Sequence, residues 1–79
     1  MEVKEMITVD IERTGKNIDQ MRRDSGLNVS DVLERMGLAS PNSFSKWIHG
    51  KSLPTIDNLV ILADLFGVGI GEIVATKAV

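Results

Sequence analysis

Cysteine is absent from this chain of 79 residues, which excludes a disulfide framework and any thiolate site. No apolar run reaches the ~18 residues that a membrane-spanning helix needs, and the opening residues do not form a signal peptide. Internal repeats and low-complexity tracts are also absent. We therefore expect one domain in the cytoplasm, with no separate sensor or catalytic module.

Residues that support enzymatic chemistry are scarce. The sole histidine, His49, has no clustered cysteine or carboxylate, so it is a poor metal ligand and is expected to face solvent or phosphate. Asp57 and Asp64 have no evident acid–base partner and are expected to serve as a helix cap and a surface charge. The glycines between residues 67 and 71 follow no strand, which argues against a phosphate-binding loop. We expect no enzyme, no cofactor and no metal.

Charge is unevenly distributed along the chain. The net charge of −2 argues mildly against a nucleic-acid partner, because phosphate neutralisation supplies much of the affinity for DNA. However, residues 1–34 hold eight acidic and five basic side chains, and residues 57–79 hold three acids and one base. Residues 35–56, here called the acid-free segment, have no carboxylate and contain Arg35, Lys46, His49 and Lys51. This segment is the only basic part of the sequence.

Capping residues and helical periodicity predict an all-α fold of five helices, at about residues 11–25, 29–36, 41–49, 56–66 and 69–74. Asn28 is a good N-cap for the second helix, and Ser40 followed by Pro41 is a good start for the third. Glycine follows the end of each of the first four helices, where it can terminate a helix. Residues 12–74 contain no strand-like segment, and residues 11–76 are expected to form the domain.

The third predicted helix separates large apolar side chains from polar ones. Phe44, Trp47 and Ile48 share one face and are expected to anchor the helix in the core. The opposite face carries, at i, i+3, i+4 and i+7, the residues Asn42, Ser45, Lys46 and His49. It offers hydrogen-bond donors and acceptors without a carboxylate, which suits the major groove of DNA. Taken alone, such a helix is more often an ordinary amphipathic helix with a solvated polar face, and the neighbouring residues favour the DNA interpretation.

A series of landmarks extends this interpretation over about residues 13–75. In chain order they are Gly26-Leu27, Gly37-Leu38, Trp47, Gly50-Lys51-Ser52-Leu53-Pro54 and Leu65-Phe66-Gly67-Val68. The series resembles the Cro and phage-repressor (XRE-like) type of small bacterial helix-turn-helix regulator. The resemblance implies a lambda-repressor-like five-helix bundle in which the second and third helices form the motif and the third reads DNA.

The chain departs from the commonest pattern of this family in three places. The interval from Gly37 to Trp47 is one residue longer than in the commonest phage repressors, which enlarges the turn before the third helix. Val29 stands where many relatives have a glutamine that can bind phosphate. Arg22 matches a basic residue that the family often pairs with a carboxylate, but Ile48 occupies the carboxylate position, so we expect no ion pair there.

Asn42 is the expected base reader, because its amide can bond N6 and N7 of adenine together. Lys46 lies one turn later, within reach of a guanine or a phosphate. The resemblance implies phosphate contacts for the loop residues Lys51 and Ser52, with a solvated loop as the alternative. The other expected DNA-binding residues are Ser40, Ser43, Ser45, His49 and Arg22.

Two further segments are candidates for assembly. Residues 1–10 form an N-terminal leader in which Ile7 to Ile11 alternate like a strand, and two interpretations stay open. The leader is either a disordered tail or a dimer arm that pairs with the same segment of another subunit. The fourth helix is unusually apolar, and the expected dimer interface is Ile61, Leu65, Val68, Ile70 and Val74. Exposed aliphatic residues without a partner are the alternative.

Together these features predict a sequence-specific regulator of transcription, a repressor and a homodimer, that reads double-stranded DNA with the helix at about 41–49. One alternative is the DNA-binding antitoxin of a toxin–antitoxin pair. Another is a protein-interaction module that kept the fold and lost DNA binding. A regulatory protein partner is compatible with each interpretation, whereas no membrane or small-molecule ligand is expected.

Overall fold

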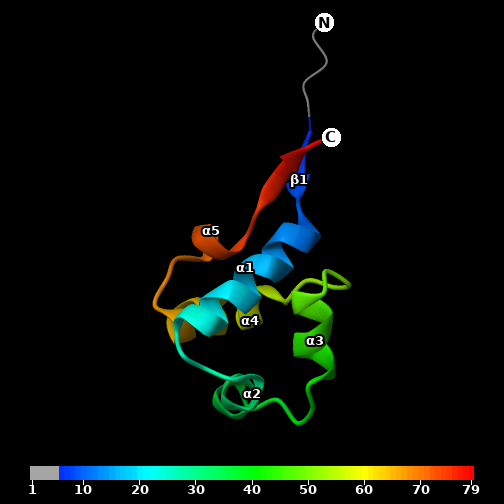
Figure 1. Ribbon diagram of the computed structural model, residues 1–79. Coiled ribbons are helices and arrows are strands. Elements are labelled where there is room, and N and C mark those ends of the chain that lie inside the picture. Colours follow the sequence, from blue (N-terminus) through cyan, green and yellow to red (C-terminus); the bar gives the residue numbers. More distant parts are fainter. Residues whose placement is uncertain (1–5) are drawn as a thin grey trace, which may run out of the picture.

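The computed structural model describes residues 6–79 and shows the predicted five-helix bundle, to which the chain ends add a short two-stranded sheet (Figure 1). The elements of this described part are β1 (Ile7–Val9), α1 (Ile11–Asp24), α2 (Val29–Met36), α3 (Asn42–Ile48), α4 (Ile56–Phe66), α5 (Ile70–Ile73) and β2 (Thr76–Ala78). Residues 1–5 of the predicted leader lie outside the described residues. Within residues 6–79, no helix is long and apolar enough to cross a membrane.

Each helix contributes one apolar side chain that is completely buried. These side chains, each 0% exposed, are Ile18 from α1, Val32 from α2, Phe44 from α3, Leu62 from α4 and Ile73 from α5. Burying a side chain of this size is worth about 1.5–3 kcal/mol. Helices this short are marginal alone in water. The shared core therefore holds the bundle together.

The helix ends follow the sequence closely. Asn28 and Asp31 form a capping box on α2, in which Asn28 Oδ1 accepts from Asp31 N at 2.8 Å and Asp31 Oδ2 accepts from Asn28 N at 3.0 Å. Thr55 caps α4 by accepting from Asn58 N at 3.2 Å, so the expectation that Asp57 caps a helix is wrong. Asp57 lies within the first turn of α4, where a negative charge is favourable.

The start of α3 differs from the prediction. The helix begins at Asn42, and no side chain caps it. Pro41 already has helical dihedral angles, and its carbonyl accepts the first helical bond from Ser45 N at 2.8 Å. Ser40 therefore remains in the turn and is not the N-cap. The physical reason is that the first helical bond is accepted by the carbonyl of Pro41 and not by that of Ser40, which makes Pro41 the cap position.

The two ends of the described chain pair with each other. β1 runs antiparallel to β2 with Ile7 opposite Ala78 and Val9 opposite Thr76. The predicted strand character of the leader is confirmed, but its partner is the carboxyl-terminal segment of the same chain, which neither interpretation included. Pairing between such distant segments leaves no local signal in the sequence. The predicted end of the domain at residue 76 also falls inside β2.

Helices α1 and α3 approach so closely that only glycine fits between them. Gly15 of α1 is buried, and a Cβ there would overlap the carbonyl oxygen of Trp47 and lie 3.1 Å from the carbonyl carbon of Ile48. On α3 the rings of Phe44 and Trp47 meet edge to face, with centroids 6.0 Å apart and an interplanar angle of 72°. The approach at Gly15 joins α3 to α1, and the ring contact orders the buried face of α3.

Gly15→Ala should lower the free energy of unfolding by about 1–3 kcal/mol, because the added methyl group forces two backbones apart. Gly71→Ala is the matched control, since a Cβ at Gly71 meets nothing within 4 Å. Urea unfolding followed by circular dichroism measures both. Equal stability of the two variants would contradict the close approach of α1 and α3.

Trp47 is 4% exposed, which confirms the predicted core role of this residue. Its native fluorescence should be blue-shifted and should move to the red on unfolding. Trp47→Ala should lower the free energy of unfolding by about 3–5 kcal/mol. A red native emission that is readily quenched would contradict this placement.

Candidate nucleic-acid interface

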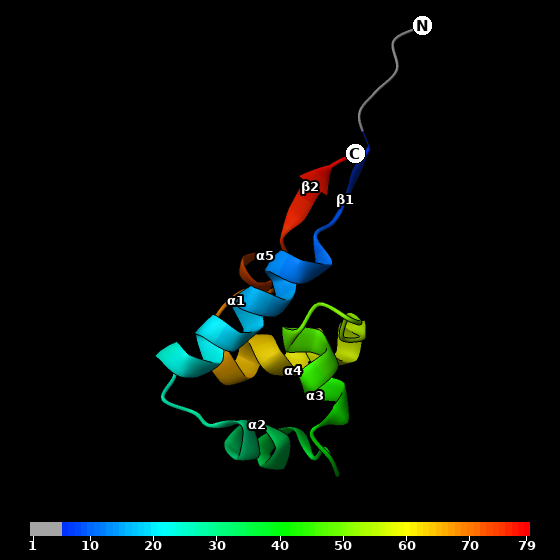
Figure 2. The same ribbon diagram turned by 45° about the vertical axis from the view of Figure 1, so that its right-hand side comes forward.

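The helical register predicted for α3 is confirmed. Phe44 and Trp47 face the core, whereas Asn42, Lys46 and His49 are exposed. Figure 2 shows that α3 lies at the outside of the bundle, so its polar face is uncovered by the described chain. This face is long enough for several side chains to meet one partner surface.

Ser45 and His49 are joined on this face. His49 Nδ1 lies 2.7 Å from the carbonyl oxygen of Ser45 and 3.2 Å from its Oγ. A carbonyl oxygen only accepts, so Nδ1 must carry the proton and donate it to Ser45. The Nε2 atom of neutral His49 is then an acceptor, and the hydroxyl proton of Ser45 is free to donate. The pair thus presents one donor and one acceptor to a ligand.

Lys51 and Ser52 follow α3 in a turn that folds back on the helix. Gly50 has a φ of 68°, the left-handed conformation that ends a helix. Lys51 N then donates to the carbonyl oxygen of Lys46 at 2.8 Å. The side chains of Lys46 and Lys51 are both exposed, and within residues 6–79 neither forms an ion pair. The backbones of Lys46 and Lys51 therefore lie close together at the end of α3, and both side chains are available to an anion.

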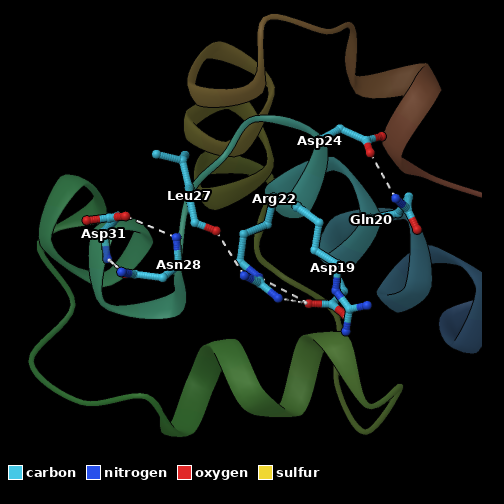
Figure 3. Close-up of polar contacts among 8 residues, drawn as sticks. Asp19, Gln20, Arg22, Asp24, Leu27, Asn28 and Asp31 are labelled. Carbon is cyan, nitrogen blue, oxygen red and sulfur yellow. Dashed lines mark hydrogen bonds and ion pairs between the residues drawn. The ribbon is translucent and has the colours of Figure 1, made fainter.

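Arg22 has contacts within the bundle that the sequence did not predict. Its Nε and Nη2 donate to Asp19 Oδ1 at 3.1 and 2.9 Å, and its Nη1 donates to the carbonyl oxygen of Leu27 at 2.9 Å (Figure 3). Asp19 thus supplies, from α1 itself, the carboxylate that position 48 lacks. The side chain of Arg22 is only 15% exposed. Arg22 ties the end of α1 to the segment that enters α2, and these bonds use three of its five N–H donors.

The other predicted DNA-contact residues lie on α3 or in the turns that flank it. Ser40 and Ser43 are exposed beside Asn42 at the start of the helix, and Ser52 is half-buried after its end. Arg35, which the sequence placed in the acid-free segment but not in the site, is exposed on α2. Its position in that segment was the signal that could have added it. The acid-free segment therefore consists of α3, the turns on both sides of it and the end of α2.

The predicted dimer interface is divided between core and surface. Leu65, Val68 and Val74 are partly buried and pack against the core, whereas Ile61 and Ile70 are 40% and 37% exposed. The sequence did not identify the two most exposed apolar residues of α4, which are Ile56 at 73% and Val60 at 52%. Helical spacing places Ile56 on the core stripe with Leu59 and Ala63, so the expectation that it faces the core is wrong: as the first residue of α4 it lies beyond the end of the core. Val60 lies outside that stripe, and its position was the available signal.

Sequence and structure comparisons agree with this architecture. Residues 17–78 match the model of a Cro/C1-type HTH DNA-binding domain. The DNA-binding domain of BldD has a similar fold, with a TM-score of 0.69, 23% identity, and coverage of 82% of this chain and 93% of that domain. The S. venezulae BldD DNA-binding domain gives the same TM-score, identity and coverage of this chain, with 96% of that domain covered. No curated protein matches the sequence.

Arg22→Gln should lower the free energy of unfolding by about 1–3 kcal/mol, because it leaves the partly buried Leu27 carbonyl without a partner. Arg23→Gln is the matched control. Arg23 is 65% exposed and binds only Asp19, so its loss should change stability by about 0.5 kcal/mol or less. Thermal unfolding of both variants tests the structural role of Arg22, which equal midpoints would contradict.

Proposed function

Because this chain belongs to the Cro/C1-type helix-turn-helix DNA-binding domain family, we propose that it is a sequence-specific transcriptional regulator, a repressor that binds double-stranded DNA as a homodimer. The outer face of α3 is the observation that supports this most directly. It combines exposed amide, hydroxyl, imidazole and ammonium groups with no carboxylate. Occupancy of DNA by such a domain is enough to block another protein, which favours repression.

Base recognition on this face centres on Asn42. Its exposed amide lies at the start of α3 and can donate to N7 of adenine while accepting from the N6 amino group. Two such bonds to one base distinguish it from the other bases. Lys46 follows one turn later and can reach guanine or phosphate. The joined pair of Ser45 and His49 adds a donor and an acceptor along the same groove. These groups give α3 the means to distinguish sequences.

Phosphate contacts come from the two ends of the helix. At its carboxyl end Lys51 and Ser52 are held by the turn that folds back on α3, and at its amino end Ser40 and Ser43 are exposed. Such contacts set the register of the protein on the duplex without reading bases. Arg22 is left out of this set because its side chain is only 15% exposed and three of its five N–H donors bind Asp19 and Leu27.

Two protomers suit the site better than one. The acid-free segment has three full positive charges, a small number for phosphate neutralisation by a protein with a net charge of −2. A twofold axis doubles both base and phosphate contacts and places the two α3 helices about 34–36 Å apart on an inverted repeat.

Asn42→Ala should weaken binding to the preferred sequence by about 1–3 kcal/mol and relax the preference at one position. Lys51→Ala should weaken binding to all sequences alike and flatten the dependence of affinity on salt. Selection from a random duplex pool, followed by titrations at several salt concentrations, measures both effects.

Lys16→Ala is the matched control for Lys51→Ala, because Lys16 is an exposed lysine of α1 outside the acid-free segment. It removes the same charge and should have a smaller effect. Unchanged sequence preference in Asn42→Ala would assign base reading to another residue. Equal effects of Lys16→Ala and Lys51→Ala would mean that only net charge matters.

A further inference from the structure

The sheet formed by β1 and β2 leaves the backbone of β1 half unpaired. Asp10 N donates to the carbonyl oxygen of Ala75, and Val79 N donates to that of Met6, both at 2.8 Å. In an antiparallel pair, residues that exchange hydrogen bonds alternate with residues that do not. The even-numbered residues of β1 therefore bond to β2, and the N–H and C=O groups of Ile7 and Val9 point away from it. These groups form the open edge of β1.

Nothing in the open edge of β1 discourages another strand from joining it. Proteins protect such edges with proline, lysine or a bulge, but Ile7-Thr8-Val9 has none of these. Lys77, the one charged residue of the sheet, is on β2 opposite Thr8. The edge is also apolar and uncovered, since Ile7 is 66% exposed and Val9 36% exposed.

The sheet is too small to be stable by itself. A two-stranded ribbon is marginal in water, and three or more strands are usually needed. Here both strands are exposed along their whole length. Figures 1 and 2 show the ribbon projecting from the end of the bundle that is remote from α2, so the described chain supplies no further strand.

We propose that the open edge of β1 pairs with the same edge of a second copy of this chain, giving a four-stranded sheet in the order β2–β1–β1–β2. With the twofold axis at Thr8, Ile7 of each copy lies opposite Val9 of the other. In this register every outward N–H and C=O of β1 finds a partner, and β-branched side chains face each other across the axis. The strand is thus complementary to itself, which an isologous dimer requires.

The assembly would place the DNA-binding helices on one rigid framework. β1 leads directly into α1 through its N-cap, Asp10. Glu12, in the first turn of α1, lies against Gly50 at the end of α3, and Gly15 lies against Trp47. Two copies that pair through β1 therefore have their α3 helices fixed relative to each other, because α1 joins β1 to α3. The polar face of each α3 stays free. This role of the dimer rests on the proposed DNA-binding function, although the pairing itself does not.

Pairing along so short an edge buries little surface, which puts the contact in the class of weak, transient interfaces. The free protein should therefore associate only at high concentration. On DNA, two adjacent half-sites hold the copies together and raise their effective concentration. Cooperative binding to an inverted repeat is the expected consequence.

The first test removes the outward N–H of β1 with Ile7→Pro, which leaves the bonds between β1 and β2 intact. Ala78→Pro is the matched control, because the same alternation places the Ala78 N–H on the outer edge of β2. Ile61→Lys tests the rival face on α4. Each variant is compared with the unaltered protein by sedimentation of the free protein and by titration of a single half-site and an inverted repeat.

Ile7→Pro should weaken self-association about tenfold or more, abolish cooperativity on the inverted repeat, and leave half-site affinity within about twofold. Ala78→Pro and Ile61→Lys should associate like the unaltered protein. Loss of association in Ile61→Lys but not in Ile7→Pro would overturn the proposal, as would a monomer at all concentrations that binds the repeat without cooperativity. Association without any DNA binding would instead refute the proposed function alone.

The second test is specific for the register and uses no proline. In the proposed dimer Thr8 lies opposite Thr8 of the second copy, so Thr8→Lys and Thr8→Glu should each self-associate more weakly because like charges meet. An equimolar mixture should restore association between unlike copies. Failure of the mixture to associate more strongly than either variant would overturn the register.

Discussion

The contact between the backbones of α1 and α3 decides where α3, the helix proposed to read DNA, lies. Gly15 lets the two backbones meet, with the carbonyl oxygen of Trp47 occupying the place that a side chain of α1 would fill. Once α3 is held there, its short length leaves one choice of register. Phe44 and Trp47 must turn inward, because exposing two aromatic rings would forfeit a large part of a small core. The polar residues of α3 then face outward as a consequence of that register.

The parts of the fold that could be predicted are those with local causes. The capping box at the start of α2 is local, because Asn28 and Asp31 are only three residues apart. Gly37 ends the helix in the left-handed conformation. The polar face of α3 follows from helical spacing alone, which is why its register is confirmed. Ser40 shows the limit of such reasoning, since a good capping residue has no effect when the helix begins one residue later, with Pro41 as its cap.

The parts that could not be predicted depend on contacts between distant residues or on competition among partners. The alternation of Ile7 to Ile11 indicated a strand, but its pairing with Thr76–Ala78 depends on the whole bundle bringing the chain ends together. For Arg22 the sequence predicted a contact with DNA and, because Ile48 replaces the carboxylate of the family, no ion pair with α3. The structure selects Asp19 together with the carbonyl of Leu27, which satisfies a half-buried backbone group as well. Among the apolar residues assigned to a dimer, Leu65, Val68 and Val74 proved to serve the core.

The charge distribution connects the fold to its use. A net charge of −2 makes the approach of this protein to DNA unfavourable as a whole. The distribution of charge along the chain offsets this, because α3 and the turns beside it belong to the acid-free segment and expose Lys46 and Lys51. The carboxylate of Asp19 is neutralised locally by Arg22 and Arg23. Screening shortens the reach of the remaining acids to about 8–10 Å at physiological salt, so the local field at α3 dominates once the helix is close to the groove. Long-range attraction is then weak, and specificity must come from short-range contacts, which a second copy on an inverted repeat would double.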